Sequence, residues 1–173
     1  MPVSPYLLGT DPGMSPAVSG LIGMLRYART TTVHAVSGLT MKQLDHRHDG
    51  ESNSIGMLLA HIAAVEAWYQ AASFDGRDWT AGEAKRWNVA ADLGPAAANV
   101  IRGRTLENYL DDLASVRART ERELEARGEE WLLEAREVRG TEMNGYWMWF
   151  HVCEDEINHR GQIRWLRKRL PPV

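Results

Sequence analysis

The stretch that decides how the chain folds is His151-Val152-Cys153-Glu154-Asp155-Glu156-Ile157-Asn158-His159-Arg160-Gly161-Gln162, near the C-terminus. Arranged as an α-helix with about 100° between successive residues, it places Asp155 and His159 within about 40° of each other. The residues on the same side of this helix are apolar: Met148, Val152, Ile163 and Leu166. Burying ionisable side chains without partners costs several kcal/mol. A metal ion bound by Asp155 and His159 would offset this cost, so the stretch predicts a helix that presents metal ligands to the interior.

A second segment, residues 54–69, also places a histidine in an apolar stripe. It begins Ser54-Ile55-Gly56-Met57-Leu58-Leu59-Ala60-His61, and the neighbours of His61 at helical spacing are Met57, Val65 and Trp68. A lone buried histidine is more often hydrogen-bonded within a core than bound to a metal. Here one carboxylate and two imidazoles on two inward faces need a common explanation. We therefore predict that His61, Asp155 and His159 bind one divalent metal ion.

The predicted ligand set limits the chemistry that is possible. Asp155 and His159 are four residues apart, and side chains at this helical spacing can reach one ion. Three protein ligands with an open position are typical of catalytic sites, whereas structural zinc usually has four. Two histidines and a carboxylate suit zinc, nickel, iron and manganese, so the sequence leaves the metal open. A buried hydrogen-bond network of the same residues, without a metal, is also left open.

Other polar residues of the C-terminal stretch are assigned to the surroundings of this site. His151 lies eight residues before His159, about 12 Å along a helix, so we expect it to line a cavity or stack on aromatic rings. Gln162 is placed to donate a hydrogen bond to one of the ligands. Gly161 faces away from the site, and we expect a neighbouring helix or a second subunit to pack closely against it.

Two glutamates flank the predicted ligands. Glu156 and Glu66 are candidates for a general base if the metal activates water. Arg160 follows Glu156 at the i+4 spacing, so we expect an ordinary surface ion pair between them. Glu156 and Gln162 are the candidate catalytic residues.

Helical periodicity predicts four long helices in an all-α protein. Their expected ranges are about 16–38, 54–69, 105–128 and from a cap at Thr141 or Asn144 to just before Pro171. Residues 72–103 have weak periodicity, with a short helix at 81–88, and a connection of this length crosses the bundle or covers a site. The arrangement predicts a four-helix bundle with one long crossover connection.

Three regions are less well defined by the sequence. Residues 1–14, rich in proline and glycine, predict an extended N-terminal arm. Residues 129–140 fit either a short helical turn or an extended segment. One face of residues 105–128 carries charges of both signs and is expected to be solvated. The charged residues on that face are Asp111, Asp112, Arg117, Arg119, Glu121, Arg122 and Glu125.

The composition narrows the functions that fit. With 173 residues, 44% hydrophobic, and a formal net charge of −3, the chain suits a single domain over residues 1–173. Basic residues gather at Arg164, Arg167, Lys168 and Arg169, where the helix dipole explains them, so we expect no nucleic-acid partner. The single cysteine, Cys153, excludes an internal disulfide and suits a reducing cytoplasm. A signal-peptide pattern and an apolar run of ~20 residues are both missing, which favours a cytoplasmic protein without a membrane partner.

The segment from Ser54 to His61, together with the segment from Asp155 to Gln162, resembles the DinB/YfiT-like superfamily of metalloenzymes, particularly an uncharacterised actinobacterial branch. The resemblance covers about residues 16–170 of the sequence. It implies a bundle, commonly a homodimer, with a divalent metal on three side chains of the second and fourth helices. The first and last family histidines match His61 and His159. The middle position is usually histidine, and this chain has Asp155 there.

The resemblance also implies a type of reaction, because relatives include mycothiol-dependent enzymes. The leading hypothesis is a metal-dependent transferase or isomerase that uses a low-molecular-weight thiol such as mycothiol. A metal would lower the pKa of the thiol and present the thiolate to a small-molecule electrophile. A metal-dependent hydrolase and a non-catalytic stress-response or binding bundle are the alternatives.

Overall fold

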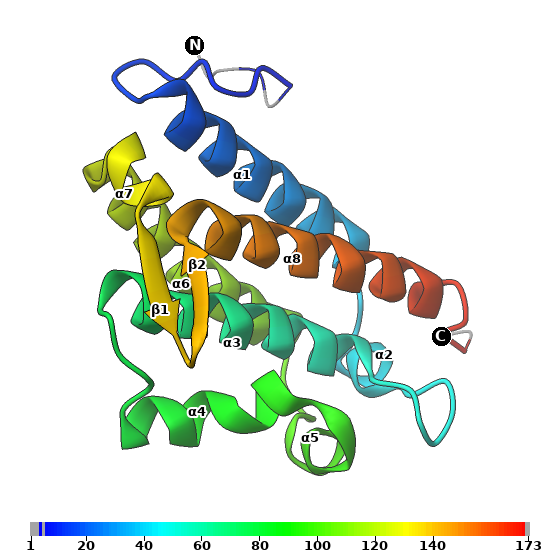
Figure 1. Cartoon of the computed structure of the whole chain (residues 1–173). Coiled ribbons are helices and arrows are strands. Elements are labelled where there is room, and N and C mark those ends of the chain that lie inside the picture. The colour runs from blue at the N-terminus through cyan, green and yellow to red at the C-terminus, as the bar shows by residue number, and fades with distance from the viewer. Residues whose placement is uncertain (1–3, 5, 172–173) are drawn as a thin grey trace.

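Four long helices form the body of the protein (Figure 1). The computed structural model describes residue 4 and residues 6–171. The long helices are α1 (Pro16–Val36), α3 (Ile55–Phe74), α6 (Leu106–Ala126) and α8 (Gly145–Arg167). Helix α8 packs against α1 and α3, and α3 packs against α6. The predicted all-α bundle is confirmed.

Each long helix begins where a side chain satisfies one of its first free amides. The side chains of Ser15, Ser54, Thr105 and Asn144 each accept a hydrogen bond from the backbone N–H three residues further on. Such caps supply an acceptor that the helix itself lacks and are worth about 1 kcal/mol each. Of the two predicted caps for the last helix, Asn144 is the one used.

Helix α3 is longer than predicted and lies at the centre of the molecule. It continues past Tyr69 to Phe74, and the residues of this last turn are mostly buried: Gln70, Ala71, Ala72 and Ser73. Helices α4, α6 and α8 all pack against α3, which is why it is buried on several sides. Gly76 follows the helix with φ of +63°, a conformation that glycine adopts without steric cost.

The long connection between α3 and α6 contains two helices, α4 (Ala81–Asp92) and α5 (Gly94–Val100). Helix α4 extends beyond the predicted range of 81–88. It packs along α3, below it in Figure 1. The connection therefore covers one side of the helix that carries His61.

Both structures considered for residues 129–140 occur, one after the other. Helix α7 (Glu129–Leu133) is followed by an antiparallel hairpin of β1 (Ala135–Val138) and β2 (Thr141–Asn144). The turn residues Arg139 and Gly140 both have positive φ, as expected for a two-residue hairpin turn that matches the twist of the strands. The hairpin leads directly into α8.

The residues before α1 form consecutive turns rather than an extended arm. Among the described residues of this region, Asp11 is held at the start of α1, because its backbone N–H donates to Ser19 Oγ at 2.9 Å. Residues 1–3 and 5 of the predicted arm lie outside the described residues. A short helix, α2 (Met41–Asp45), connects α1 to α3.

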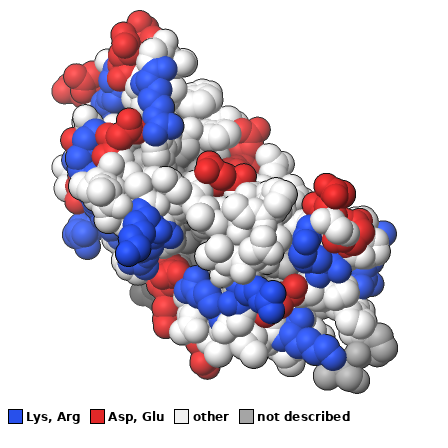
Figure 2. Space-filling model, turned by 90° about the horizontal axis from the view of Figure 1, so that it is seen from below, with Lys and Arg blue, Asp and Glu red and all other residues white. Residues whose placement is uncertain are grey.

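The surface carries charges of both signs. On the face seen from below in Figure 2, basic and acidic side chains are interspersed and neither sign forms one broad patch. Within the described part of the chain, every helix is too short or too polar to span a membrane.

Candidate metal centre

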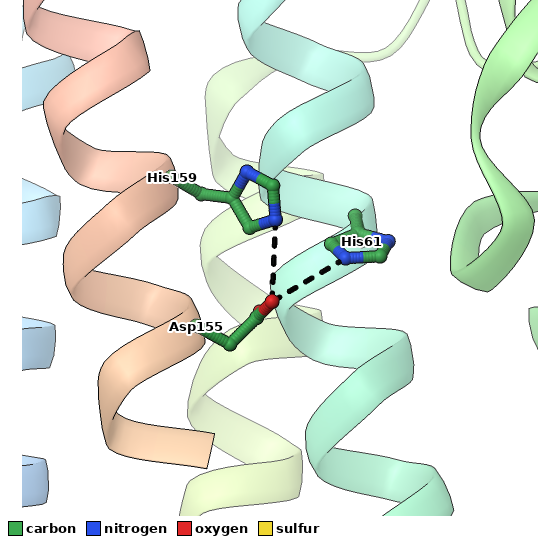
Figure 3. A group of neighbouring side chains, drawn as sticks. All are labelled: His61, Asp155 and His159. Carbon is green, nitrogen blue, oxygen red and sulfur yellow. Dashed lines mark ion pairs between the residues drawn. The ribbon is translucent and has the colours of Figure 1, made fainter. Parts of the chain in front are cut away.

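His61 on α3 and the pair Asp155 and His159 on α8 point toward one another between the two helices (Figure 3). Oδ1 of Asp155 lies 3.3 Å from Nε2 of His159 and 3.7 Å from Nε2 of His61. One ligand atom from each residue lies within 4.8 Å of the others. The sequence prediction that these three side chains share one location agrees with the geometry.

Two of the three separations are close to the spacing that a shared divalent ion requires, and all three atoms lie within 4.8 Å of one another. Ligand atoms about 2.0–2.2 Å from one ion are themselves about 3–3.5 Å apart at tetrahedral angles. The two separations at Asp155 Oδ1 are 3.3 and 3.7 Å, and both imidazoles direct Nε2 toward the same carboxylate oxygen. Two imidazole nitrogens and one carboxylate oxygen therefore fit a divalent ion such as zinc, nickel, iron or manganese.

The crossover helix α4 orients His61. Nδ1 of His61 lies 2.9 Å from the backbone carbonyl oxygen of Ala90. Because a carbonyl only accepts, Nδ1 carries a proton, so Nε2 is the nitrogen that faces Asp155 and that would bind a metal in its deprotonated form. A backbone carbonyl that fixes the tautomer of a histidine is a common support for metal ligands.

The electrostatics of the cluster keep Asp155 ionised. Burial by itself would raise the pKa of Asp155, but hydrogen bonding and charge from His159 and His61 outweigh it and hold this pKa well below its usual range. Burial would lower the pKa of His61, and the Asp155 carboxylate together with the Ala90 carbonyl raises it above its usual value. An ionised carboxylate is the form that binds a metal.

His159 has one ring nitrogen that is not satisfied. Its Nδ1 is buried and has no hydrogen-bond partner among the described residues. The side chains of His61, His159 and Asp155 are 12%, 14% and 16% exposed, so the cluster is largely but not completely buried. Gln162 was expected to donate to a ligand, but it is exposed, and no hydrogen bond joins it to Asp155 or His159 in the described structure.

Aromatic rings surround His151, which lies one helical turn before Asp155 on α8. His151 stacks on Trp147 with ring centroids 5.3 Å apart and meets the edge of Tyr69 at 5.7 Å, so it stacks on aromatic rings as expected. Burial, and then the charge of Asp155, raises the pKa of Tyr69 to about 12. Tyr69 therefore keeps its hydroxyl proton at neutral pH.

The expected surface ion pair between Glu156 and Arg160 is wrong. Glu156 is fully buried, and Arg160 donates to Thr31 instead. Oε1 of Glu156 accepts from Arg29 at 2.9 Å, and Oε2 accepts from Arg117 at 3.0 Å. A general base needs a lone pair directed at a substrate proton. In Glu156 both oxygens face arginines.

Glu66 is also buried against the same two arginines. Its Oε2 accepts from Arg29 at 2.8 Å, and its Oε1 accepts from Arg117 at 2.7 Å. Arg117 is 5% exposed, so its assignment to a solvated face of α6 is wrong. We name Arg29, Glu66, Arg117 and Glu156 the Arg–Glu cluster. One member comes from each long helix.

The fold and the three converging side chains define a class: all-α bundles with a candidate metal site between two helices. The sequence profile of the mycothiol-S-transferase family, MST, matches residues 20–172. The chain therefore belongs to the mycothiol-S-transferase family. A comparison with curated proteins finds no match.

Solved structures share the fold. A conserved protein from Enterococcus faecalis superposes with a TM-score of 0.66 at 16% identity, over 87% of this chain and 94% of that chain. An uncharacterised protein from Clostridium difficile 630 superposes with a TM-score of 0.65 at 12% sequence identity, over 87% of this chain and 95% of that chain. A protein from Streptococcus pneumoniae superposes with a TM-score of 0.64 at 15% identity, over 87% of this chain and 88% of that chain. At these identities the likeness shows the fold alone.

Proposed function

We propose that the protein is a divalent-metal-dependent enzyme that activates a low-molecular-weight thiol of the mycothiol type for transfer to a small electrophile, or for a thiol-assisted isomerisation. The observation that carries the proposal is the convergence of His61, Asp155 and His159 on one partly exposed point between α3 and α8. Membership of the mycothiol-S-transferase family supports the thiol.

His61, Asp155 and His159 would hold the metal, and each is prepared for this role differently. Ala90 fixes the tautomer of His61, so that Nε2 faces the site. Asp155 contributes a negative charge, and His159 contributes a second imidazole nitrogen. When bound, a divalent ion supplies a positive charge that lowers the pKa of a thiol sulfur.

The reaction would form one sulfur–carbon bond. The thiol proton leaves to solvent, the sulfur lone pair forms the bond to the electrophilic carbon, and a leaving group departs with its own electron pair. Tyr69, which keeps its proton at neutral pH and senses the charge of Asp155, would be a hydrogen-bond donor for a substrate bound nearby.

Metal analysis is the first test of this proposal. Protein purified without chelator is expected to contain about one divalent ion per chain by elemental analysis, and His159→Ala is expected to lose it because two remaining ligands hold an ion weakly. Arg26→Met, which removes an exposed ion pair, serves as the control and should keep the metal. Full metal retention in His159→Ala would contradict the ligand assignment.

An activity panel tests the thiol. Consumption of small electrophiles should require both the metal-loaded protein and an added thiol, and it should disappear in Asp155→Asn. Turnover that needs the metal but proceeds equally well without thiol would replace the proposal with a metal-dependent hydrolase.

A further inference from the structure

The Arg–Glu cluster is a closed arrangement of four charges in the protein interior. Arg29 on α1 and Arg117 on α6 each contact both Glu66 on α3 and Glu156 on α8, at 2.7–3.0 Å for the shortest contact of each pair. Both glutamates are 0% exposed, and both arginines are below a tenth exposed. The four charges sum to zero, so the cluster needs no further ion.

Further hydrogen bonds complete the cluster. Arg29 Nη1 donates to the carbonyl of Leu113, and Arg117 Nη1 donates to the carbonyl of Leu25. Thr120 Oγ1 donates to Glu66 Oε1 at 2.7 Å. Each arginine therefore binds the backbone of the helix that carries the other arginine. The cluster links all four long helices through directional contacts.

Stability alone does not account for such a cluster. Replacing a buried ion pair or triad with apolar residues of similar volume is often neutral or stabilising, because desolvation of the charges consumes the attraction between them. A better attested role for buried charged groups is to select one arrangement of packed helices among several. An apolar core tolerates small rotations and shifts, whereas paired carboxylates and guanidinium groups do not.

The position of the Arg–Glu cluster indicates that it fixes the arrangement of α3 relative to α8. Its two carboxylates are on α3 and α8, the same two helices that carry the three candidate ligands. Glu156 follows Asp155 directly, and Glu66 lies five residues after His61. The two carboxylates repel each other, so α3 and α8 are joined here through the arginines of α1 and α6.

We propose that Arg29 and Arg117 are positioning residues for the metal centre, because they fix the rotation of α3 and α8 that brings His61 to Asp155 and His159. This inference rests on the proposed function, because its first test measures the binding of a metal ion. Ligands must be held within about 0.5 Å of their productive places, a tolerance that apolar packing between two helices does not provide alone.

The test removes the charges without leaving any of them unpaired. The variant carries Arg29→Met, Glu66→Leu, Arg117→Met and Glu156→Leu, and cobalt(II) is titrated as the probe metal, with its d–d absorption as a report on ligand geometry. We expect a cooperatively folded protein whose cobalt affinity is about 10–100-fold weaker, with a changed spectrum. The matched control is Arg26→Met with Glu121→Leu, which removes an exposed pair between α1 and α6. A folded quadruple variant with the affinity and spectrum of the unmodified protein would overturn the proposal.

A second variant covers the case in which the quadruple variant does not fold. Arg117→Lys keeps the charge but loses the planar contact with both glutamates, so cobalt affinity should again fall, by about tenfold, while the fold is kept. Unchanged affinity in folded Arg117→Lys would also overturn the proposal.

A metal-free measurement separates this inference from the proposed function. If the unmodified protein binds no cobalt, the proposed function fails, and the positioning role is read from the histidines themselves. The rings of His61 and His159 have centroids 4.6 Å apart, so protons on the two rings should show a nuclear Overhauser effect in metal-stripped protein. Loss of this effect in the Arg–Glu variants supports the positioning role, and its persistence in them refutes it.

Discussion

The candidate metal centre and the Arg–Glu cluster lie on the same two helices, yet they differ in completeness. In the Arg–Glu cluster each carboxylate oxygen accepts from a guanidinium group at 2.7–3.3 Å. In the metal centre the nearest contacts are 3.3 and 3.7 Å, and the Nδ1 atom of His159 has no partner among the described residues. The Arg–Glu cluster, in which every carboxylate oxygen has a partner, holds the helices together. The candidate metal centre, which is partly exposed and has longer contacts, has room for an additional ion.

Breaking the Arg–Glu cluster at one member should have the largest effect on stability. Glu66→Ala leaves Arg29 and Arg117 with one carboxylate between them, and an uncompensated buried charge costs about 3–5 kcal/mol. Denaturant unfolding followed by circular dichroism measures the loss. Glu121→Ala, which removes a surface partner of Arg26, should cost less than about 1 kcal/mol. Equal losses for the two variants would remove the distinction between buried cluster and surface pair.

Acid should destabilise the protein through the same cluster. Burial opposes ionisation of Glu66, but Arg117, Arg29 and Thr120 outweigh it and lower the pKa of Glu66 from 4.5 to about 2. A lowered carboxyl pKa contributes stability that is present above the unfolded pKa and is lost as the pH falls through the folded pKa. The free energy of unfolding should therefore decrease by on the order of 3 kcal/mol between about pH 4.5 and 2.

Denaturant titrations at several pH values check this dependence. The groups that face Glu66 are Arg29, Arg117 and Thr120, with Glu156 across the arginines. Glu66→Gln should flatten the profile in the same window. A Glu66→Gln profile as steep as that of the unmodified protein would show that other carboxyl groups cause the acid sensitivity.

The sequence predicted the candidate ligands because helical periodicity fixes the direction of a side chain. The apolar stripes of two helices contain His61, Asp155 and His159. Side chains in such a stripe face the interior of the bundle, where they meet the facing helix. The bundle followed from the same periodicity. The support of His61 by Ala90 could not be predicted, because a backbone carbonyl has no sequence signal and the path of α4 depends on tertiary packing.

The Arg–Glu cluster was missed although part of its signal was present. Arg29 lies four residues after Leu25 and three before Thr32, within the apolar stripe of α1. Arg117 occupies the same kind of position between Leu113 and Thr120 on α6. Charged residues were assigned to solvated faces because a buried arginine is favourable only with partners, and the partners come from other helices.

A substitution at Gly161 is expected to have the smallest effect on stability. It tests whether the metal centre depends on the helical stability of α8 or on the orientation of that helix. A Cβ added at Gly161 would meet nothing within 4 Å in the described structure, so no helix of this chain packs there. Glycine in an exposed helix interior costs about 1 kcal/mol relative to alanine. Gly161→Ala should therefore raise the free energy of unfolding by about 0.5–1 kcal/mol, as measured by denaturant titration, and leave cobalt affinity unchanged.

The same substitution can be combined with Arg117→Lys. If the double variant regained the cobalt affinity of the unmodified protein, the Arg–Glu cluster would support the metal centre by stabilising α8 and not by fixing its orientation. A loss of stability that depends on protein concentration would instead show that a second copy packs against Gly161.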